Sequence, residues 1–149
     1  MPLLAARAKR VGSSFAGKEV LVFEQTDAFS GYSVSNKAEA LQFYGDVLGC
    51  DLEETKEGIL LHFPNGHTVF LYEKLDHEPA GFTVLNFPVD DIDKAIDDLE
   101  IKGIEMLMYE DLPAEQDGKG VLRGKSAGMG PDIAWFKDPS GNVLSVLEE

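Results

Sequence analysis

The alternation of apolar and polar residues predicts a strand and then an amphipathic helix near the start of the folded part of the chain. Residues 29–36 (FSGYSVSN) alternate as a strand does. Residues 36–49 (NKAEALQFYGDVLG) place apolar side chains at helical spacing, with Asn36 as the cap and Gly49 as the end. We therefore expect a strand that leads directly into a helix.

Three short apolar segments follow and predict the remaining strands of the same unit. They are CDLEET (50–55), ILLHFP (59–64) and TVFLYEK (68–74). The sequence Pro64-Asn65-Gly66 between the last two favours a hairpin turn. The first unit therefore has the order βαβββ.

The second half of the chain repeats this order. Its segments are FTVLNFPVD (82–90), DIDKAIDDLEIKG (91–103), IEMLMY (104–109), DIAWFKD (132–138) and NVLSVLE (142–148). Val34 corresponds to Val89 and Asn36 to Asp91, and the turn Pro64-Asn65-Gly66 corresponds to Pro139-Ser140-Gly141. Residues 110–131 are extra in the second half. A glycine-rich insertion of this length favours a lid or binding loop, with plain disorder as the alternative.

Two tandem βαβββ modules predict an α+β fold in which they form a cupped mixed sheet with the helices on the outer side. We expect one domain over residues 27–149, with module one at 27–76 and module two at 80–149. Residues 1–26 are predicted to be an N-terminal extension that begins with a basic, acid-free stretch. Part of it (KEVLVFEQT) alternates enough to add an edge strand.

Composition narrows the possible partners. The net charge is −14, with 27 acidic against 13 basic residues, so phosphate backbones and anionic lipid surfaces are unfavourable partners. No apolar run reaches the length of a membrane span. The single cysteine, Cys50, allows no internal disulfide and fits a reducing compartment, so we expect a cytoplasmic protein without nucleic-acid or membrane partners.

Two segments carry a resemblance to a known superfamily, NKAEALQFYGDVLGC (36–50) and FKDPSGNVLSVLE (136–148). Within a paired βαβββ architecture they resemble the vicinal-oxygen-chelate superfamily, which includes glyoxalase I, bleomycin-resistance proteins and extradiol dioxygenases. The resemblance covers about residues 27–149. It implies the fold, because the same scaffold carries lyases, epimerases, dioxygenases and drug-binding proteins.

In metal-dependent members of that superfamily, His, Gln or Glu ligands come from equivalent inward positions on the first and last strands of each module. Those positions hold Phe29, Phe70, Val84 and Ser145 in this chain. Phenyl rings cannot coordinate a metal, and a serine hydroxyl is a poor ligand. We therefore expect no metal and no other cofactor.

Period-two alternation assigns the remaining strand residues to two faces. Tyr32, Val34, Leu144 and Val146 fall on the helix side. The opposite, concave side is predicted to be an aromatic-lined cup with a few hydrogen-bonding groups. The candidate ligand-binding residues are Phe29, Ser33, Phe70, Tyr72, Asn86, Trp135 and Ser145. The alternative is that these aromatic side chains fill the cup as ordinary core.

Two function classes remain from the sequence. The first is a metal-independent protein of the glyoxalase/bleomycin-resistance type that binds a small aromatic or cationic ligand; the resemblance implies a homodimer in which the second subunit completes the cup. The alternative is an enzyme, either a glyoxalase-like lyase or isomerase or a ring-cleaving dioxygenase. Tyr109 and His77 could act as acid or base, and Arg123 could meet an anionic group, but the sequence assigns no catalytic residue.

Overall fold

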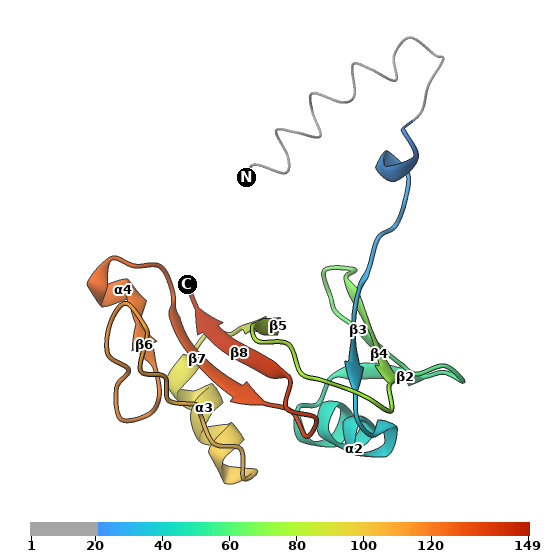
Figure 1. Ribbon diagram of the computed structural model, residues 1–149. Coiled ribbons are helices and arrows are strands. Elements are labelled where there is room, and N and C mark those ends of the chain that lie inside the picture. Colours follow the sequence, from blue (N-terminus) through green and yellow to red (C-terminus); the bar gives the residue numbers. More distant parts are fainter. Residues whose placement is uncertain (1–20) are drawn as a thin grey trace.

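The computed structural model describes residues 21–149 as two tandem modules, each built from a strand, a helical segment and three further strands (Figure 1). Module one contains β1 (Ser30–Val34), α2 (Lys37–Leu41), the π-helix η2 (Gln42–Val47), β2 (Asp51–Glu54), β3 (Ile59–His62) and β4 (Thr68–Glu73). Module two contains β5 (Thr83–Pro88), α3 (Ile92–Ile101), β6 (Leu122–Arg123), α4 (Gly124–Ala127), β7 (Asp132–Lys137) and β8 (Val143–Glu148). The predicted α+β fold with two βαβββ modules is confirmed.

Each module forms its own four-stranded mixed sheet. The strand orders are β1-β4-β3-β2 and β5-β8-β7-β6. In each sheet the first strand of the module pairs in parallel with the last, and the other pairs are antiparallel. The hairpin turns also match, because Gly66 and Gly141 both adopt a positive φ, at 86° and 85°.

The helices begin at the predicted caps. The Asn36 side chain accepts a hydrogen bond from the Glu39 amide, and Asp91 accepts one from the Lys94 amide. After its first turn the module-one helix widens into η2, and this change accommodates one more residue before the terminal glycine than in module two. The apolar side of each helix is buried in the hydrophobic core, as Ala40, Phe43 and Tyr44 in module one and Ile92, Ile96 and Leu99 in module two show.

The helix sides of the two modules share one hydrophobic core. Val34, Tyr44 and Leu71 from module one belong to the same buried cluster as Leu99 and Phe136 from module two. In Figure 1, α2 lies between the first sheet and module two, while α3 lies beneath the second sheet. Because both helix sides turn toward the shared core, the concave faces of the two sheets turn away from each other.

Three local expectations are wrong. Residues 104–109 form no strand, although the Leu107 amide donates to the Trp135 carbonyl oxygen. The fourth strand of the second sheet is β6, inside the predicted loop 110–131, where Val121 is fully buried. The segment expected to form an added edge strand, residues 18–26, forms none over residues 21–26, where the structure has the 3-10 turn η1 (Val22–Glu24). Residues 18–20 of this segment lie outside the described range.

Candidate functional site

The two segments that carried the family resemblance meet in a buried polar junction between the modules. Tyr44 in η2 donates a hydrogen bond to an oxygen of Asp138 at 2.7 Å, and Tyr32 in β1 donates to the Tyr44 hydroxyl at 2.8 Å. Tyr44 is fully buried and Asp138 is 4% exposed. Burial, together with the charge of Asp138, raises the pKa of both phenols well above the ordinary value, so both remain hydrogen-bond donors.

Asp138 is the acceptor at the centre of this polar junction. Besides Tyr44, it accepts from the backbone amides of Ser140 and Asn142, both at 2.9 Å, and from the Asn142 side chain at 3.0 Å. The Asn142 side chain also donates to the carbonyl oxygen of Ser33 in module one. The turn DPSGN (138–142) therefore stabilises its own hairpin and also binds module two to module one.

The linker between the modules is tied to the same junction by His77. Its Nδ1 lies 2.7 Å from the Ser33 hydroxyl, and its Nε2 lies 3.0 Å from the Ser140 carbonyl oxygen. Ser33 was a candidate ligand-binding residue. In the structure its hydroxyl contacts His77 and its carbonyl oxygen accepts from Asn142, and both contacts hold the modules together.

The pseudo-symmetric counterpart of the polar junction is apolar. The repeat that pairs Val34 with Val89 also pairs Tyr32 with Phe87 and Tyr44 with Leu99, and the repeated turns pair Asp138 with Phe63. The Phe63 and Phe87 rings meet edge to face with their centroids 6.1 Å apart. No hydrogen-bonding side chain is available at any of these three positions.

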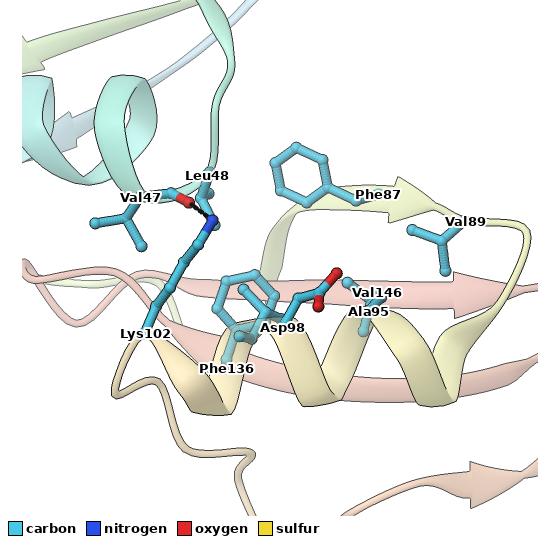
Figure 2. Close-up of a pocket in the computed structure, with 10 residues that line it drawn as sticks. Val47, Leu48, Phe87, Val89, Ala95, Asp98, Lys102, Phe136 and Val146 are labelled. Carbon is cyan, nitrogen blue, oxygen red and sulfur yellow. Dashed lines mark hydrogen bonds between the residues drawn. The ribbon is translucent and has the colours of Figure 1, made fainter.

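A cavity of about 250 Å³ lies beside this apolar junction (Figure 2). Its walls are mostly apolar, and the charged members are Asp98 from α3 and Lys102 directly after this helix. The Lys102 ammonium donates to the Val47 carbonyl oxygen at 2.6 Å, which links the end of α3 to the end of η2. The lining residues are Val47, Leu48, Phe87, Val89, Ala95, Asp98, Leu99, Lys102, Phe136 and Val146. None of the candidate ligand-binding residues lines this cavity.

Three of the candidate residues form a row across the concave face of module two. Asn86 in β5, Ser145 in β8 and Trp135 in β7 are direct cross-strand neighbours. The Ser145 hydroxyl is fully buried and donates to the Asn86 side-chain oxygen at 2.6 Å. Ser145 is thus satisfied within the sheet, and the amide nitrogen of Asn86 is the polar group left for a ligand.

Tyr109 extends the row at the Trp135 end. Its ring meets the indole edge to face, with the centroids 5.5 Å apart at 87°. Both rings line a pocket of about 320 Å³ on this face. The residues around it are Gly81, Phe82, Thr83, Tyr109, Asp111, Leu112, Trp135 and Val143. Burial, and secondarily the charge of Asp111, raises the pKa of the Tyr109 hydroxyl, so this phenol stays protonated near neutral pH and is not available as a general base.

The remaining candidates lie on the concave face of module one. Phe70 and Tyr72 in β4 stack with their ring centroids 5.8 Å apart and an interplanar angle of 20°. Phe29, directly before β1, is 63% exposed, and Tyr72 is 38% exposed. Because the two concave faces point apart, no contact joins these aromatic side chains to the row on module two.

The four positions at which metal-dependent relatives carry ligands do not fit a metal. Phe29 and Phe70 offer no donor atom, and Val84 falls at an irregularity in the β5–β8 pairing. The Ser145 hydroxyl already has a partner. Within residues 21–149, no group of three or more His, Cys, Asp or Glu side chains could hold a metal ion. No helix in that range is long and apolar enough to cross a membrane.

The insertion of module two is held by ion pairs. Arg123 in β6 contacts Asp93 at 2.8 Å and Asp117 at 2.9 Å, with Asp132 at 3.6 Å. The Arg123 hydrogen bond lowers the pKa of Asp93 to about 2. Arg123 was a candidate partner for an anionic ligand. In the structure its guanidinium is paired with these three carboxylates.

The pattern of the strands did not reveal the residues that complete the module-two pocket. Phe82 and Asp111 were not singled out, and Tyr109 was considered for acid or base chemistry alone. Phe82 lies at the end of the linker, and Asp111 lies in the insertion. Phe82 begins the predicted strand 82–90 and has the same parity as Asn86, so the alternation could have placed it on the concave face. Asp111 belongs to no strand pattern, so only the folded arrangement brings it to Trp135.

Comparison with protein families gives one match, over residues 28–146, to the family described as Glyoxalase/Bleomycin resistance protein/Dioxygenase superfamily. The matched range covers both modules except the last residues of β8, and it includes Tyr44 and Asp138 of the polar junction. A comparison with curated protein sequences finds no match.

Solved structures share the fold at low sequence identity. A glyoxalase family protein from Enterococcus faecalis is 19% identical, with a TM-score of 0.57 over 85% of this chain and 100% of that one. A superfamily member from Sphaerobacter thermophilus is 22% identical, with a TM-score of 0.57 over 83% and 98%. TnmS3, an antibiotic binding protein from Streptomyces sp. CB03234, is 20% identical, with a TM-score of 0.55 over 83% and 97%. At these identities the likeness shows the fold alone.

Proposed function

The chain belongs to the Glyoxalase/Bleomycin resistance protein/Dioxygenase superfamily, and from that premise we propose that it binds a small aromatic or cationic molecule without a metal. The observation that carries the proposal is the chemistry of the concave faces. They present the aromatic side chains of Phe70, Tyr72 and Trp135, and the side-chain amide of Asn86 is free to orient a ligand. The four positions at which the family resemblance implies metal ligands hold Phe29, Phe70, Val84 and Ser145 instead. The antibiotic-binding protein that shares this fold is a precedent for such a role.

The ligand site is proposed to form between two copies of the chain. One copy presents two aromatic faces that point apart, so a single chain cannot enclose a ligand between them. A homodimer that places the Phe70–Tyr72 face of one copy against the Asn86–Trp135 face of the other would form two identical cups. The rim of partly exposed aromatic side chains suits such burial.

Metal content tests the chemistry directly. Protein purified without chelators is expected to contain no stoichiometric zinc, nickel, iron or manganese. A thermal-shift screen with aromatic and cationic compounds is expected to yield stabilising ligands, because anything that binds only the folded state raises the melting temperature. A stoichiometric metal would overturn the proposal in favour of a lyase, isomerase or dioxygenase, and a screen without any stabilising compound would indicate a filled core.

Mixing two variants tests the shared cup. Phe70→Ala damages the module-one face and Trp135→Ala the module-two face, so each homodimer is expected to lose binding of the best compound from the screen. After the two are unfolded and refolded together, about half of the dimers contain one copy of each, and each of these has one intact cup. Calorimetry of this mixture should then detect about a quarter of the binding sites that the wild-type protein has. No recovery, or a monomer in light scattering, would contradict the shared cup.

The cellular location belongs to the same proposal. One free cysteine, half-buried and with its pKa raised to about 11 by burial, fits a protein of the reducing cytoplasm. Fractionation of cells that express the native protein should find it in the cytoplasmic fraction.

A further inference from the structure

The pocket on the concave face of module two has three aromatic walls and one charged side chain. Phe82, Tyr109 and Trp135 supply the aromatic walls, and Asp111 supplies the charge. Phe82 is 70% exposed although it is a large apolar residue. These residues come from the end of the linker, the segment after α3 and strand β7, so three separate parts of the chain converge on this pocket.

The Tyr109 wall is fixed in place by Gln116. The Gln116 side-chain oxygen accepts from the Tyr109 amide at 2.7 Å, and its nitrogen donates to the carbonyl oxygens of Leu107 and Gly120. Leu107 is itself bonded through its amide to the Trp135 carbonyl oxygen. The edge-to-face contact of Tyr109 with Trp135 therefore rests on a braced backbone, which keeps the aromatic walls preorganised.

The Asp111 carboxylate makes no ion pair or side-chain hydrogen bond among residues 21–149. The basic side chains nearest to it in sequence are engaged elsewhere: Lys102 with the Val47 carbonyl oxygen, Lys119 with Asp93 and Asp97, Arg123 with Asp93, Asp117 and Asp132, and Lys125 with Glu148. Asp111 contributes to the raised pKa of Tyr109, which places its charge close to the aromatic walls. Among the residues that line the pocket, Asp111 is the only charged one. Lys137 follows Trp135 by two residues on β7, opposite Val143, and does not itself line the pocket.

We propose that this pocket binds the ammonium head of an organic cation, either a protonated amine or a quaternary ammonium, with the aromatic faces of Phe82, Tyr109 and Trp135 around it and Asp111 as its counter-ion. Aromatic faces attract cations through the ring quadrupole, most strongly for tryptophan and tyrosine. The net charge of −14 favours the approach of a cation and disfavours an anion. This inference rests on the proposed function and selects the cationic class of ligand for the same concave face.

The emission of Trp135 provides the test, because it is the only tryptophan in the chain. The full-length protein is titrated with benzyltrimethylammonium and, separately, with neutral benzyl alcohol, which shares the phenyl ring. We expect saturable quenching by the ammonium compound with about tenfold tighter binding than the alcohol. Asp111→Asn and Tyr109→Leu should each weaken ammonium binding about fivefold or more.

Asp46→Asn is the matched control, because Asp46 is exposed and unpaired among the described residues. This variant should bind benzyltrimethylammonium with the affinity of the wild type. Melting temperatures of all variants confirm that they fold. Equal binding of both compounds without an effect of Asp111→Asn would overturn the ammonium site while leaving a small-molecule cup intact. No response of Trp135 to the ammonium compound would also overturn it, and the thermal-shift screen would then decide separately on the proposed function.

Discussion

Two junctions join the modules of this protein, and they occupy equivalent positions of a repeated structure with opposite chemistry. On one side, Tyr32, Tyr44 and Asp138 form a chain of buried hydrogen bonds. On the other side, the equivalent residues are Phe87, Leu99 and Phe63, and an apolar cavity of about 250 Å³ remains beside them. The first junction depends on directional hydrogen bonds between buried side chains. The second depends mainly on apolar packing, with the bond from Lys102 to the Val47 carbonyl oxygen at its edge.

This difference explains why two motifs far apart in the sequence mark the same fold. The FYGDVLG segment supplies the Tyr44 hydroxyl, and the DPSGN segment supplies the carboxylate that accepts from it. A buried hydrogen-bonded pair tolerates few substitutions, because loss of either partner leaves the other unsatisfied. The apolar side can vary as long as its volume is roughly kept.

The largest expected effect comes from removal of the central acceptor of the polar junction. Asp138→Ala leaves the Tyr44 hydroxyl and the Asn142 amide without their buried acceptor and removes two further backbone bonds. We expect the free energy of unfolding to fall by about 3 to 4 kcal/mol, measured by urea denaturation. The control, Asp46→Ala at an exposed site, should change it by less than about 0.5 kcal/mol. If Asp138→Ala and Asp46→Ala lowered the free energy of unfolding equally, the hydrogen bonds of the polar junction would not stabilise the fold as argued.

A smaller effect is expected from Tyr44→Phe, which makes that position resemble its apolar counterpart Leu99. The ring still fills its site, but the Tyr32 hydroxyl loses its acceptor and Asp138 loses one donor. We expect a loss of about 2 kcal/mol in the same assay. Adding Tyr32→Phe should recover part of that loss, since the stranded hydroxyl is then gone; a further full loss would show that the chain of bonds is not cooperative.

Val34 and Val89 offer a matched test of packing, because they are repeat counterparts. Val34 is 1% exposed in a filled core, whereas Val89 lines the cavity of the apolar junction. Val34→Ile is expected to cost about 1 kcal/mol through overpacking. Val89→Ile should stabilise by about 0.5 kcal/mol, because the added methyl group enters existing space. Chemical denaturation of both variants measures the sign, and a loss in both would mean that the two junctions are equally full.

The smallest effect concerns the helices that flank the junctions, since α3 carries Asp93 where α2 carries Ala38. Arg123 lowers the pKa of Asp93 from 3.8 to about 2, so the ion pair stabilises the fold above about pH 4 and this contribution disappears as the pH falls toward 2. Asp93→Asn should therefore lower the melting temperature slightly at pH 6 and by less near pH 2. Because the side chain is half exposed, the shift is small and shrinks in high salt. An unchanged difference at both pH values would contradict this assignment.

Local structure was predictable from the sequence where a single residue type determines the backbone conformation, as at helix caps and tight turns. The caps Asn36 and Asp91 and the turn glycines Gly66 and Gly141 act within a few residues of chain, so their pattern identified both helices and both hairpins. Period-two alternation also assigned the buried side of each sheet correctly, as the burial of Val34 and Leu144 shows.

The arrangement of the candidate site was not predictable from those patterns. Alternation states which side of its own sheet Phe70 or Trp135 occupies, but not how one sheet is turned toward the other. That orientation depends on contacts between residues more than 90 positions apart, such as Tyr44 with Asp138 and Ser33 with Asn142. The strand β6 was missed for a related reason, because Leu122 and Arg123 form too short a segment to show any period.

His77 gives the junction a property that no carboxylate could supply. In the neutral ring with hydrogen on Nε2, Nδ1 accepts from the Ser33 hydroxyl while Nε2 donates to the Ser140 carbonyl oxygen. One ring therefore accepts from module one and donates to module two at the same time, whereas a carboxylate can only accept.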